Sequence, residues 1–263
     1  MNLGTNISIF SIYYRGGEYN TAWISNQEAT GVWGNVARVY ADRCNIKKYT
    51  TVVDSLTVIN EYDEKLLPLL DEIIKESSDK PKHFYTIHLM GTHSIYSERY
   101  PDNFQVFNAD EEPAKDEKQR EVQAEYDNAI LYNDFIVNEI IKRFEAKDSI
   151  IIYISDHGES VFEDGKTRGH YFEEPSNVLF EIPMLVWISQ EFRNKHSDLV
   201  ERIFSARNQP FMTDDMIHAL LDIMQIHTKD YDETRSLFSP NFNFNRKRIY
   251  DGHEYVTGKG FEN

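Results

Sequence analysis

The stretch IIIYISDHGES (residues 150–160) joins an apolar run to two residues that can bind a metal. Five apolar, mostly β-branched residues lead into Ser155, and a short apolar run of this kind is typical of a strand that is buried on both faces. Asp156 and His157 follow directly, where such a strand ends. The sequence therefore predicts that a buried strand at residues 149–155 delivers a carboxylate and an imidazole to one edge of a sheet.

Short β-rich runs alternate with longer amphipathic runs along the rest of the chain. Further strands are predicted at residues 20–25, 50–53, 83–90, 182–189 and 248–250. Helices are predicted from apolar periodicity at residues 62–76, 117–146 and 213–226. This alternation indicates an α/β fold, a mostly parallel sheet with helices on both faces. In such sheets ligands bind beyond the carboxyl ends of the strands.

Two of the predicted helices contain residues that influence where the helix begins. Pro68 lies inside the first helix and predicts a kink or a late start, because proline interrupts the hydrogen bonds of a helix interior. Thr213 suits the N-cap of the last helix, and Asp214 and Asp215 suit the positive end of its dipole.

Length and composition indicate one globular domain. The chain has 263 residues, of which 40% are hydrophobic, and no linker rich in proline, glycine or serine divides it, so residues 1–263 are predicted to form a single domain. No apolar run approaches the roughly 20 residues that a membrane helix needs. The first residues lack the basic start and apolar core of a signal peptide. The chain as given is therefore predicted to be soluble, with no signal or transmembrane segment.

Charge and cysteine content exclude several classes of partner and site. The net charge is −16, from 28 basic and 44 acidic residues. This balance argues against a nucleic-acid partner, because phosphate contacts need clustered lysine and arginine. Cys44 is the single cysteine, which excludes an internal disulfide and a cysteine-based metal site. Any metal must be held by histidine and acidic side chains.

Candidate ligands follow two of the predicted strands. His93 lies in the loop GTHSIYSERYP, and Asp156 and His157 lie in the loop DHGES. His170 lies further along the second loop, and the turn-prone sequence EDGK can fold that loop back toward the strand end. If the two strands are neighbours, these side chains face one crevice. Imidazole and carboxylate ligands suit zinc, and they are also compatible with manganese or another divalent metal.

Simpler interpretations exist for each of these residues. An Asp-His pair after a strand is also typical of a turn closed by an aspartate hydrogen bond. His93 alone is compatible with an ordinary loop histidine, and His88 inside the strand is predicted to pack or to support a ligand. Glu159 is either a partner of the ligands or a helix cap. The histidines that show no clustering are predicted to be surface or structural residues: His83, His196, His218, His227 and His253.

Several segments together resemble one family. HLMGTHSIYSERYP, EYDNAILYNDFIVNEII, IIYISDHGES with GHYFEEPS, and IPMLVWIS resemble, in this order, the catalytic domain of bacterial phosphoethanolamine transferases, members of the sulfatase and alkaline phosphatase superfamily. YNTAWISNQ, FMTDDMIHALLDI and SLFSPNFN extend the similarity over nearly the whole chain. Because it has a single cysteine, the chain resembles the branch that modifies lipopolysaccharide core heptose more than the disulfide-rich branch that modifies lipid A.

The resemblance implies an α/β/α sandwich that holds zinc, at the periplasmic face of the bacterial inner membrane. It implies transfer of phosphoethanolamine from the phospholipid phosphatidylethanolamine, through a threonine nucleophile, to a lipopolysaccharide or other lipid-linked sugar acceptor. Carried over by matching segments, Asp156 and His157 would be zinc ligands. His93 and His170 would bind the phosphoryl group or a second metal.

The family's opening segment has no counterpart in this sequence. That segment contains the first sheet strand with an acidic zinc ligand, and the threonine nucleophile; Thr5 and Thr21 do not lie in a matching context. The expectation is a C-terminal portion of the catalytic domain, from a truncation, a split gene or a misassigned start. Such a chain would lack the nucleophile, reach the membrane only through the missing region, and self-associate through an exposed sheet edge. A sulfatase-like or phosphatase-like hydrolase and a non-catalytic remnant are the alternatives.

Overall fold

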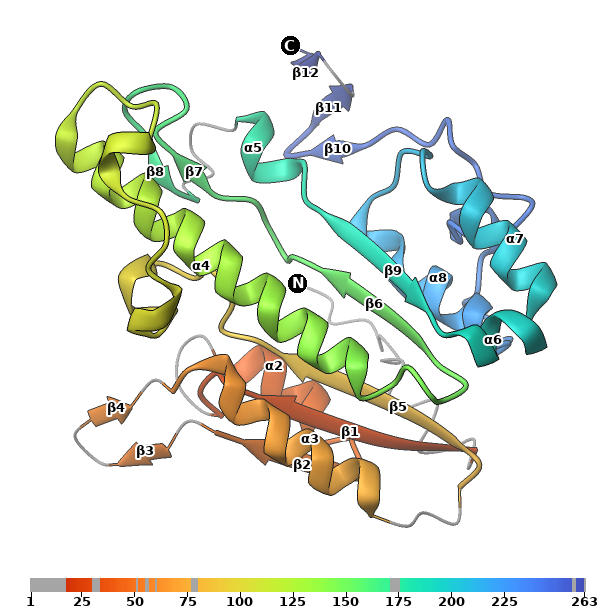
Figure 1. The fold of residues 1–263 in the computed structure, drawn as a ribbon. Coiled ribbons are helices and arrows are strands. Elements are labelled where there is room, and N and C mark those ends of the chain that lie inside the picture. Colours follow the sequence, from red (N-terminus) through yellow and green to blue (C-terminus); the bar gives the residue numbers. More distant parts are fainter. Residues whose placement is uncertain are drawn as a thin grey trace. The chain divides into compact units, whose positions relative to one another are not determined.

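The computed structural model describes most of the chain as two compact units (Figure 1). The described residues are 18–29, 34–50, 52–54, 57–59, 61–76, 80–170, 176–256 and 259–262. The first unit comprises Met1–Arg143 and Val161–Gly165, and the second comprises Phe144–Ser160 and Lys166–Asn263. Thr5 and part of the segment GHYFEEPS lie outside the described residues. A single domain over the whole chain stays a prediction.

A parallel sheet forms the centre of the first unit. Strand β1 (Tyr19–Ser25) pairs with β2 (Ile46–Tyr49) on one edge and with β5 (Lys82–His88) on the other, in parallel on both sides. The strands predicted at residues 20–25 and 83–90 are therefore confirmed, and so is their parallel direction. Strand β2 was not predicted, because its two lysines hide the apolar pattern, as is common in edge strands.

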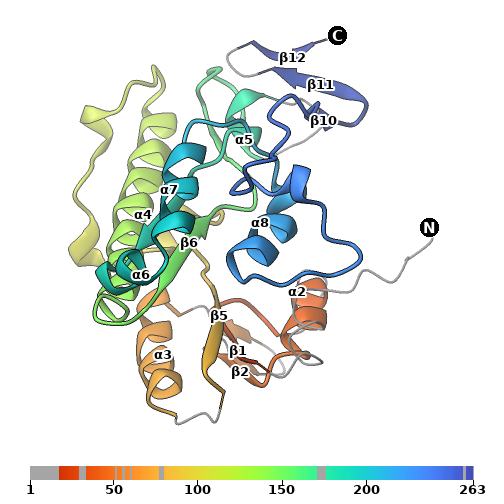
Figure 2. The ribbon, with the colours of Figure 1, turned by 90° about the vertical axis from the view of Figure 1, so that its right-hand side faces the viewer.

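Helices cover both faces of this sheet. Figure 2 shows α3 (Leu66–Lys75) and α2 (Gly34–Ala41) on opposite sides of the strands. A 3₁₀ turn, η1 (Asp63–Lys65), precedes α3 and leaves Pro68 in the first helical turn, where its missing N–H is tolerated. The late start is thus the correct alternative. Helix α3 buries its apolar face through Leu66, Leu67, Leu70 and Ile73.

The remaining elements of the first unit are one long helix and short connections. Helix α4 (Glu117–Lys142) begins at the N-cap Asp116, whose carboxylate accepts from the Lys118 and Gln119 N–H groups. A small hairpin joins β3 (Val52–Asp54) to β4 (Thr57–Ile59), so the strand predicted at 50–53 lies slightly later. The 3₁₀ turns before α4 are η2 (Tyr96–Glu98), η3 (Asp102–Phe104) and η4 (Ala109–Glu111).

Two antiparallel strands and three helices form the core of the second unit. Strand β6 (Ile150–Ile154) pairs antiparallel with β9 (Met184–Ile188). Helices α6 (Gln190–Lys195), α7 (Ser197–Ala206) and α8 (Met216–Ile223) contribute to a hydrophobic cluster against which both strands pack. The predicted parallel direction does not extend to this pair. Antiparallel neighbours need no crossover helix, and here a loop with the short strands β7 (Ser160–Val161) and β8 (Arg168–Gly169) connects them.

Strand β6 is not completely buried, and this is the second difference from the prediction. All five residues of β6 are only partly buried, and its partner strand presents Leu185, 44% exposed, opposite Tyr153. An apolar β-branched run predicts a strand, but what covers its two faces depends on elements distant in sequence.

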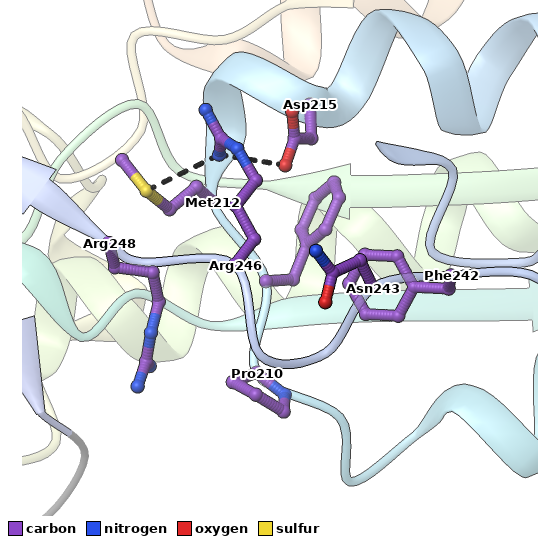
Figure 3. A pocket seen from close by; sticks show the side chains of 8 residues that line it. Pro210, Met212, Asp215, Phe242, Asn243, Arg246 and Arg248 are labelled. Atoms are coloured by element: carbon purple, nitrogen blue, oxygen red, sulfur yellow. Dashed lines mark hydrogen bonds and ion pairs between the residues drawn. The ribbon is translucent and has the colours of Figure 1, made fainter. Parts of the chain in front are cut away.

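The start of the last helix also differs from the prediction. Thr213 is not the N-cap: a 3₁₀ turn, η5 (Thr213–Asp215), precedes α8, and Asp215 stands at the cap without a side-chain capping bond. Asp215 is 2% exposed and forms ion pairs with Arg235 and with Arg246, whose Nη1 lies 2.9 Å away (Figure 3). A buried carboxylate requires such partners, and this requirement overrides local capping.

A small cavity lies beside this ion-pair network (Figure 3). Its volume is about 10 Å³, which is close to the least that holds one water molecule. Phe211, Asn243 and Arg248 are among the residues that line it, and none of the lining residues is a predicted ligand. The cavity is too small to be a substrate site.

The chain ends in a three-stranded antiparallel sheet of β10 (Ile249–Tyr250), β11 (His253–Val256) and β12 (Gly260–Glu262). The late strand predicted near residues 248–250 is confirmed. The short helices α5 (Asn177–Phe180) and η6 (Glu233–Arg235) complete the second unit. Across the described ranges, every helix is too short or too polar to cross a lipid bilayer.

His218 on α8 should make stability depend on pH. Its ring is 6% exposed, and Nδ1 accepts the Asp232 backbone N–H at 3.1 Å, so the neutral ring is required. Burial, assisted by the charge of Arg235, lowers the pKa of His218 below its ordinary value of 6.5. The unfolded chain therefore binds this proton more readily. The stabilisation is complete above pH 6.5 and is lost as the pH falls through 6.5 toward the lower folded pKa.

The measurement is the melting temperature between about pH 7.5 and pH 5.5, a window in which most carboxylates stay ionised. His218→Asn should reduce the loss of melting temperature over this window. The exposed His253, replaced in the same way, should leave the loss unchanged. An equal pH dependence in the wild type and His218→Asn would contradict the assignment.

Candidate metal centre

The turn after β6 presents the predicted ligand pair. The Ser155 hydroxyl donates to the His157 carbonyl at 2.6 Å, and Asp156 Oδ1 accepts the His157 backbone N–H at 3.1 Å. These bonds are those of an ordinary tight turn. Because only one carboxylate oxygen of Asp156 is used, the turn does not exclude a second role for this residue.

Gly158 fixes the position of the turn within the second unit. Its N–H donates to the Leu179 carbonyl at 2.9 Å, and a Cβ atom on residue 158 would lie 1.8 Å from the Val178 carbonyl oxygen. No other residue type fits this close approach to α5 without a shift of the backbone. The glycine of DHGES therefore holds the ligand pair against a fixed neighbour.

The hydrogen bond of His157 determines which of its nitrogens can bind a metal. Nδ1 lies 2.8 Å from the Gly158 carbonyl oxygen, which can only accept, so Nδ1 carries the proton. Nε2 then carries the lone pair, and it lies 3.8 Å from Asp156 Oδ2. Two metal bonds of about 2 Å each can span this separation. The Asp156 side chain is 89% exposed, so an ion there would be open to a substrate. The donor atoms present fit zinc.

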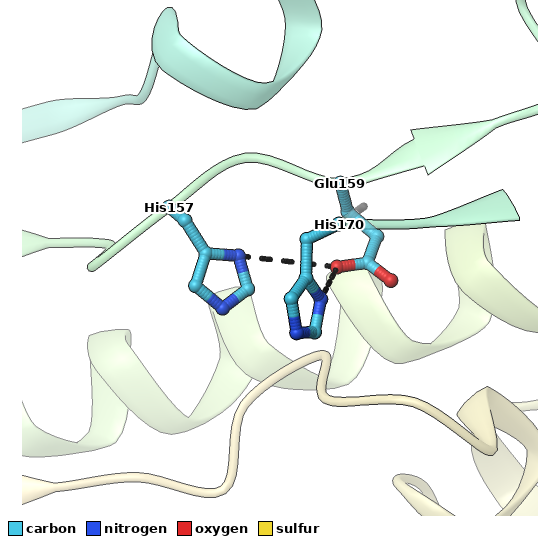
Figure 4. A group of neighbouring side chains, drawn as sticks. All are labelled: His157, Glu159 and His170. Carbon is cyan, nitrogen blue, oxygen red and sulfur yellow. Dashed lines mark hydrogen bonds and ion pairs between the residues drawn. The ribbon is translucent and has the colours of Figure 1, made fainter. Parts of the chain in front are cut away.

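Glu159 and His170 form a second pair, and both lie beside His157 (Figure 4). Glu159 Oε2 lies 3.0 Å from His170 Nδ1, and the rings of His157 and His170 have centroids 4.1 Å apart. The Glu159 side chain is only 8% exposed. The loop is held in its reversed path by the Ser160 hydroxyl, which donates to the Thr167 carbonyl at 3.2 Å. The predicted return of His170 toward the strand end is therefore observed.

An ion bound among His157, Glu159 and His170 is an alternative arrangement. One ligand atom of each residue lies within 4.8 Å of the other two. However, Nδ1 of both histidines donates to an oxygen, so only Nε2 of each ring can bind an ion while these hydrogen bonds are kept, and Glu159 Oε2 already accepts from His170 Nδ1. We therefore favour Asp156 and His157 as the ligand pair, with Glu159 orienting His170. A carboxylate that holds the second nitrogen of a histidine is a common support for ligands.

His93 belongs to the first unit, and its association with the second-unit residues stays a prediction. It is exposed at the end of a turn after β5, and its Nδ1 lies 3.3 Å from the Ser94 hydroxyl.

His88 packs, as expected: its ring lies 5.4 Å from Trp23, and Nδ1 lies 3.1 Å from the Ser25 hydroxyl. Thr21 is buried in β1, and its hydroxyl donates to Asn45.

Glu159 is the residue whose importance the sequence understated. The sequence is compatible with a partner of the ligands or with a helix cap, and the contact with His170 supports the first alternative. The available signal is its position two residues after His157 in the loop DHGES. The contact itself depends on the return of the loop.

Comparison with known proteins gives a consistent picture. A sequence model described as Sulfatase matches residues 9–226. Phosphoethanolamine transferase EptC of Escherichia coli O18:K1:H7 is 32% identical over 235 residues, which cover 85% of this chain and 39% of that protein. Phosphoethanolamine transferase CptA of Salmonella typhimurium is 30% identical over 232 residues, with coverage of 85% and 39%. The chain thus spans 39% of the length of these curated relatives.

A solved structure agrees with these similarities. The C-terminal periplasmic domain of EptC from Escherichia coli, crystallised in complex with Zn, aligns with a TM-score of 0.77 at 29% identity. The alignment covers 89% of this chain and 66% of that domain. The α/β fold predicted from the sequence is therefore confirmed.

Removal of the His157 ring should weaken zinc binding. His157→Ala takes away Nε2, one of two donor atoms that can share an ion, so the zinc dissociation constant should rise at least about tenfold. Isothermal titration of metal-stripped protein with zinc measures this change. His253→Ala removes an exposed histidine elsewhere in the same unit and is the matched control. Equal affinity for the wild type and His157→Ala would refute the assignment.

Glu159 should determine the tautomer of His170. In metal-free protein the carboxylate accepts from Nδ1, so long-range ¹H–¹⁵N spectra should show His170 protonated at Nδ1. In Glu159→Ala this preference should disappear, because the acceptor is gone, while the resonances of His253 stay unchanged. An unaltered His170 tautomer in the variant would show that Glu159 does not orient the ring.

Proposed function

Because the chain belongs to the sulfatase family, we propose that it transfers phosphoethanolamine from phosphatidylethanolamine to a lipopolysaccharide-type acceptor. The observation that carries the proposal is a ligand pair, Asp156 and His157, beside a carboxylate-held His170, in a chain whose relatives are phosphoethanolamine transferases. The chain spans 39% of the length of those relatives, so the donor, the acceptor and the activity are proposed here and not carried over as facts.

We assign the metal to Asp156 and His157. Support comes from the 3.8 Å separation of their donor atoms and from the bond between His157 Nδ1 and the Gly158 carbonyl, which leaves the lone pair on Nε2. Zinc, when bound, would stabilise negative charge on the oxygens of the phosphoryl group. The metal in the related Escherichia coli domain is zinc, which favours it over manganese for this chain.

We propose that His170 and His93 bind the phosphoryl group. Glu159 accepts a hydrogen bond from His170 Nδ1, which orients the ring. When Nε2 also carries a proton, it can donate to a phosphoryl oxygen of the donor lipid. His93 would supply a second donor from the turn after β5. A second metal held by these two histidines is the alternative use of the same nitrogens.

We place the reaction at the periplasmic face of the inner membrane. The solved Escherichia coli domain to which this chain is similar is a periplasmic domain, which supports this location. Phosphatidylethanolamine is a membrane lipid, so the donor would approach the site from the bilayer. The acceptor would be a sugar of the lipopolysaccharide core, in agreement with the similarity to EptC over 85% of the chain.

Movement of a labelled headgroup tests this function. Membranes from cells that express the protein are supplied with phosphatidylethanolamine labelled in its ethanolamine and with lipopolysaccharide. The label should appear on the lipopolysaccharide, and a zinc chelator should abolish its transfer. His157→Ala should reduce the rate about a hundredfold or more, because a metal contributes several kcal/mol of charge stabilisation. His253→Ala should transfer at the wild-type rate.

The family also contains sulfatases, so hydrolysis is the competing function. The same membranes are therefore assayed with an aryl sulfate and an aryl phosphate. Zinc-dependent release of the aryl alcohol without labelled lipopolysaccharide would replace the transferase proposal with a hydrolase. The absence of both reactions would indicate a non-catalytic chain.

A further inference from the structure

Asp63 is a buried carboxylate in the first unit that the proposed chemistry does not use. It is the first residue of η1 and is 4% exposed. Its Oδ1 accepts from Asn26 Nδ2 at 2.7 Å and from the Met90 N–H at 2.9 Å, and its Oδ2 accepts from the Gly91 N–H at 2.8 Å. A buried acid with three donors is held in a single geometry.

These bonds connect the ends of two parallel strands. Asn26 follows β1 directly, is fully buried, and its N–H donates to the His88 carbonyl at 2.9 Å. The Asn26 amide also donates to the Glu61 carbonyl at 2.7 Å. Met90 and Gly91 follow β5. Asp63 therefore holds the chain where it leaves the carboxyl edge of the sheet, the edge at which ligands bind in folds of this kind.

The same two N–H groups begin the turn that ends at His93. The His93 N–H lies 3.3 Å from the Met90 carbonyl oxygen, which closes a four-residue turn. Gly91 has a φ of +58°, a value that glycine adopts without strain. With both N–H groups at the start of the turn held by one buried carboxylate, the direction of His93 depends on Asp63. His93 itself is exposed.

The hydrogen-bonding groups around Asp63 match an ionised carboxylate. Burial raises the pKa of Asp63 above its ordinary value, and the Met90, Gly91 and Asn26 donors and the positive Arg99 offset only part of this increase. All three hydrogen-bonding groups donate, so each requires an acceptor. In a protonated carboxyl group, the added hydrogen would point toward one of these three donors.

We propose that Asp63 is a positioning residue, whose carboxylate fixes the Met90–Gly91 turn and thereby places His93 for the phosphoryl group. The role of His93 rests on the proposed function. The fixing of the turn does not, since it follows from the contacts of Asp63 alone. A purely structural Asp63 would stabilise the fold without acting through His93, and the two roles give different results in a double-mutant cycle.

Amide hydrogen exchange tests the turn without any need for activity. In Asp63→Asn the side-chain NH₂ opposes one of the backbone donors, so the Met90 and Gly91 amides should exchange at least about tenfold faster. The amides of β1 should stay protected. Asp71→Asn is the matched control, because Asp71 on the neighbouring α3 bonds to Arg143 and does not touch the turn. Unchanged exchange at Met90 and Gly91 would overturn the proposal.

Transfer kinetics test the link to His93. Asp63→Asn should lower kcat/KM for the transfer about tenfold to a hundredfold, as expected for a displaced catalytic group. In a His93→Ala background the same change should cause no further loss. Independent losses that multiply would show that Asp63 does not act through His93 and would overturn its positioning role.

Gly91→Ala provides a second route if Asp63→Asn fails to fold. It strains the turn through the positive φ and leaves the buried charge in place, and the nearest atom to the new Cβ, Asn133 Nδ2 at 3.6 Å, leaves room for it. It should show the same faster exchange and the same lack of additivity with His93→Ala. If wild-type protein transfers no phosphoethanolamine while exchange responds as expected, the proposed function fails and the fixing of the turn by Asp63 stands.

Discussion

Strand β1 bonds to β2 on one edge and to β5 on the other, and in this register Ser25 lies opposite both Tyr49 and His88. The three strands therefore end together, and the segments that follow them are brought to one edge. The bond from the Asn26 N–H to the His88 carbonyl extends this pairing beyond the strands. The contacts of Asp63 with Asn26 and with the turn after β5 are possible only because the two strand ends are level.

The second unit orients its functional side chains by a related principle. An acceptor that cannot donate decides which imidazole nitrogen carries the proton: the Gly158 carbonyl for His157 and the Glu159 carboxylate for His170. The remaining nitrogen of each ring is then defined chemically before any ligand arrives. Close packing of Gly158 on α5 keeps this arrangement in place. A backbone carbonyl and a neighbouring side chain, rather than the histidines alone, thus determine which nitrogen of each ring carries the proton.

Most secondary structure followed from local pattern, and the differences have identifiable physical causes. Apolar periodicity located α3 and α4, and the β-rich runs located β1, β5, β6 and β9. The N-cap assigned to Thr213 was wrong, because the demand of the buried Asp215 for arginine partners outweighs a capping bond. Complete burial of β6 was also wrong, and the antiparallel pairing of β6 with β9 is an exception within a sheet predicted to be mostly parallel. Both depend on which elements lie beside the strand, and the residues of the strand do not encode that information.

The sequence by itself determined the kinds of ligand available, the order of strands and helices, and the resemblance that the family match confirms. It also predicted Asp156, His157, His93 and His170 as candidate site residues, since each follows a strand or returns along its loop. Only the tertiary structure decided that Glu159 meets His170, and that Asp63 meets Met90 and Gly91. The physical reason is the range of these bonds: they join residues 11 to 28 positions apart, so they exist only after the chain has folded back on itself.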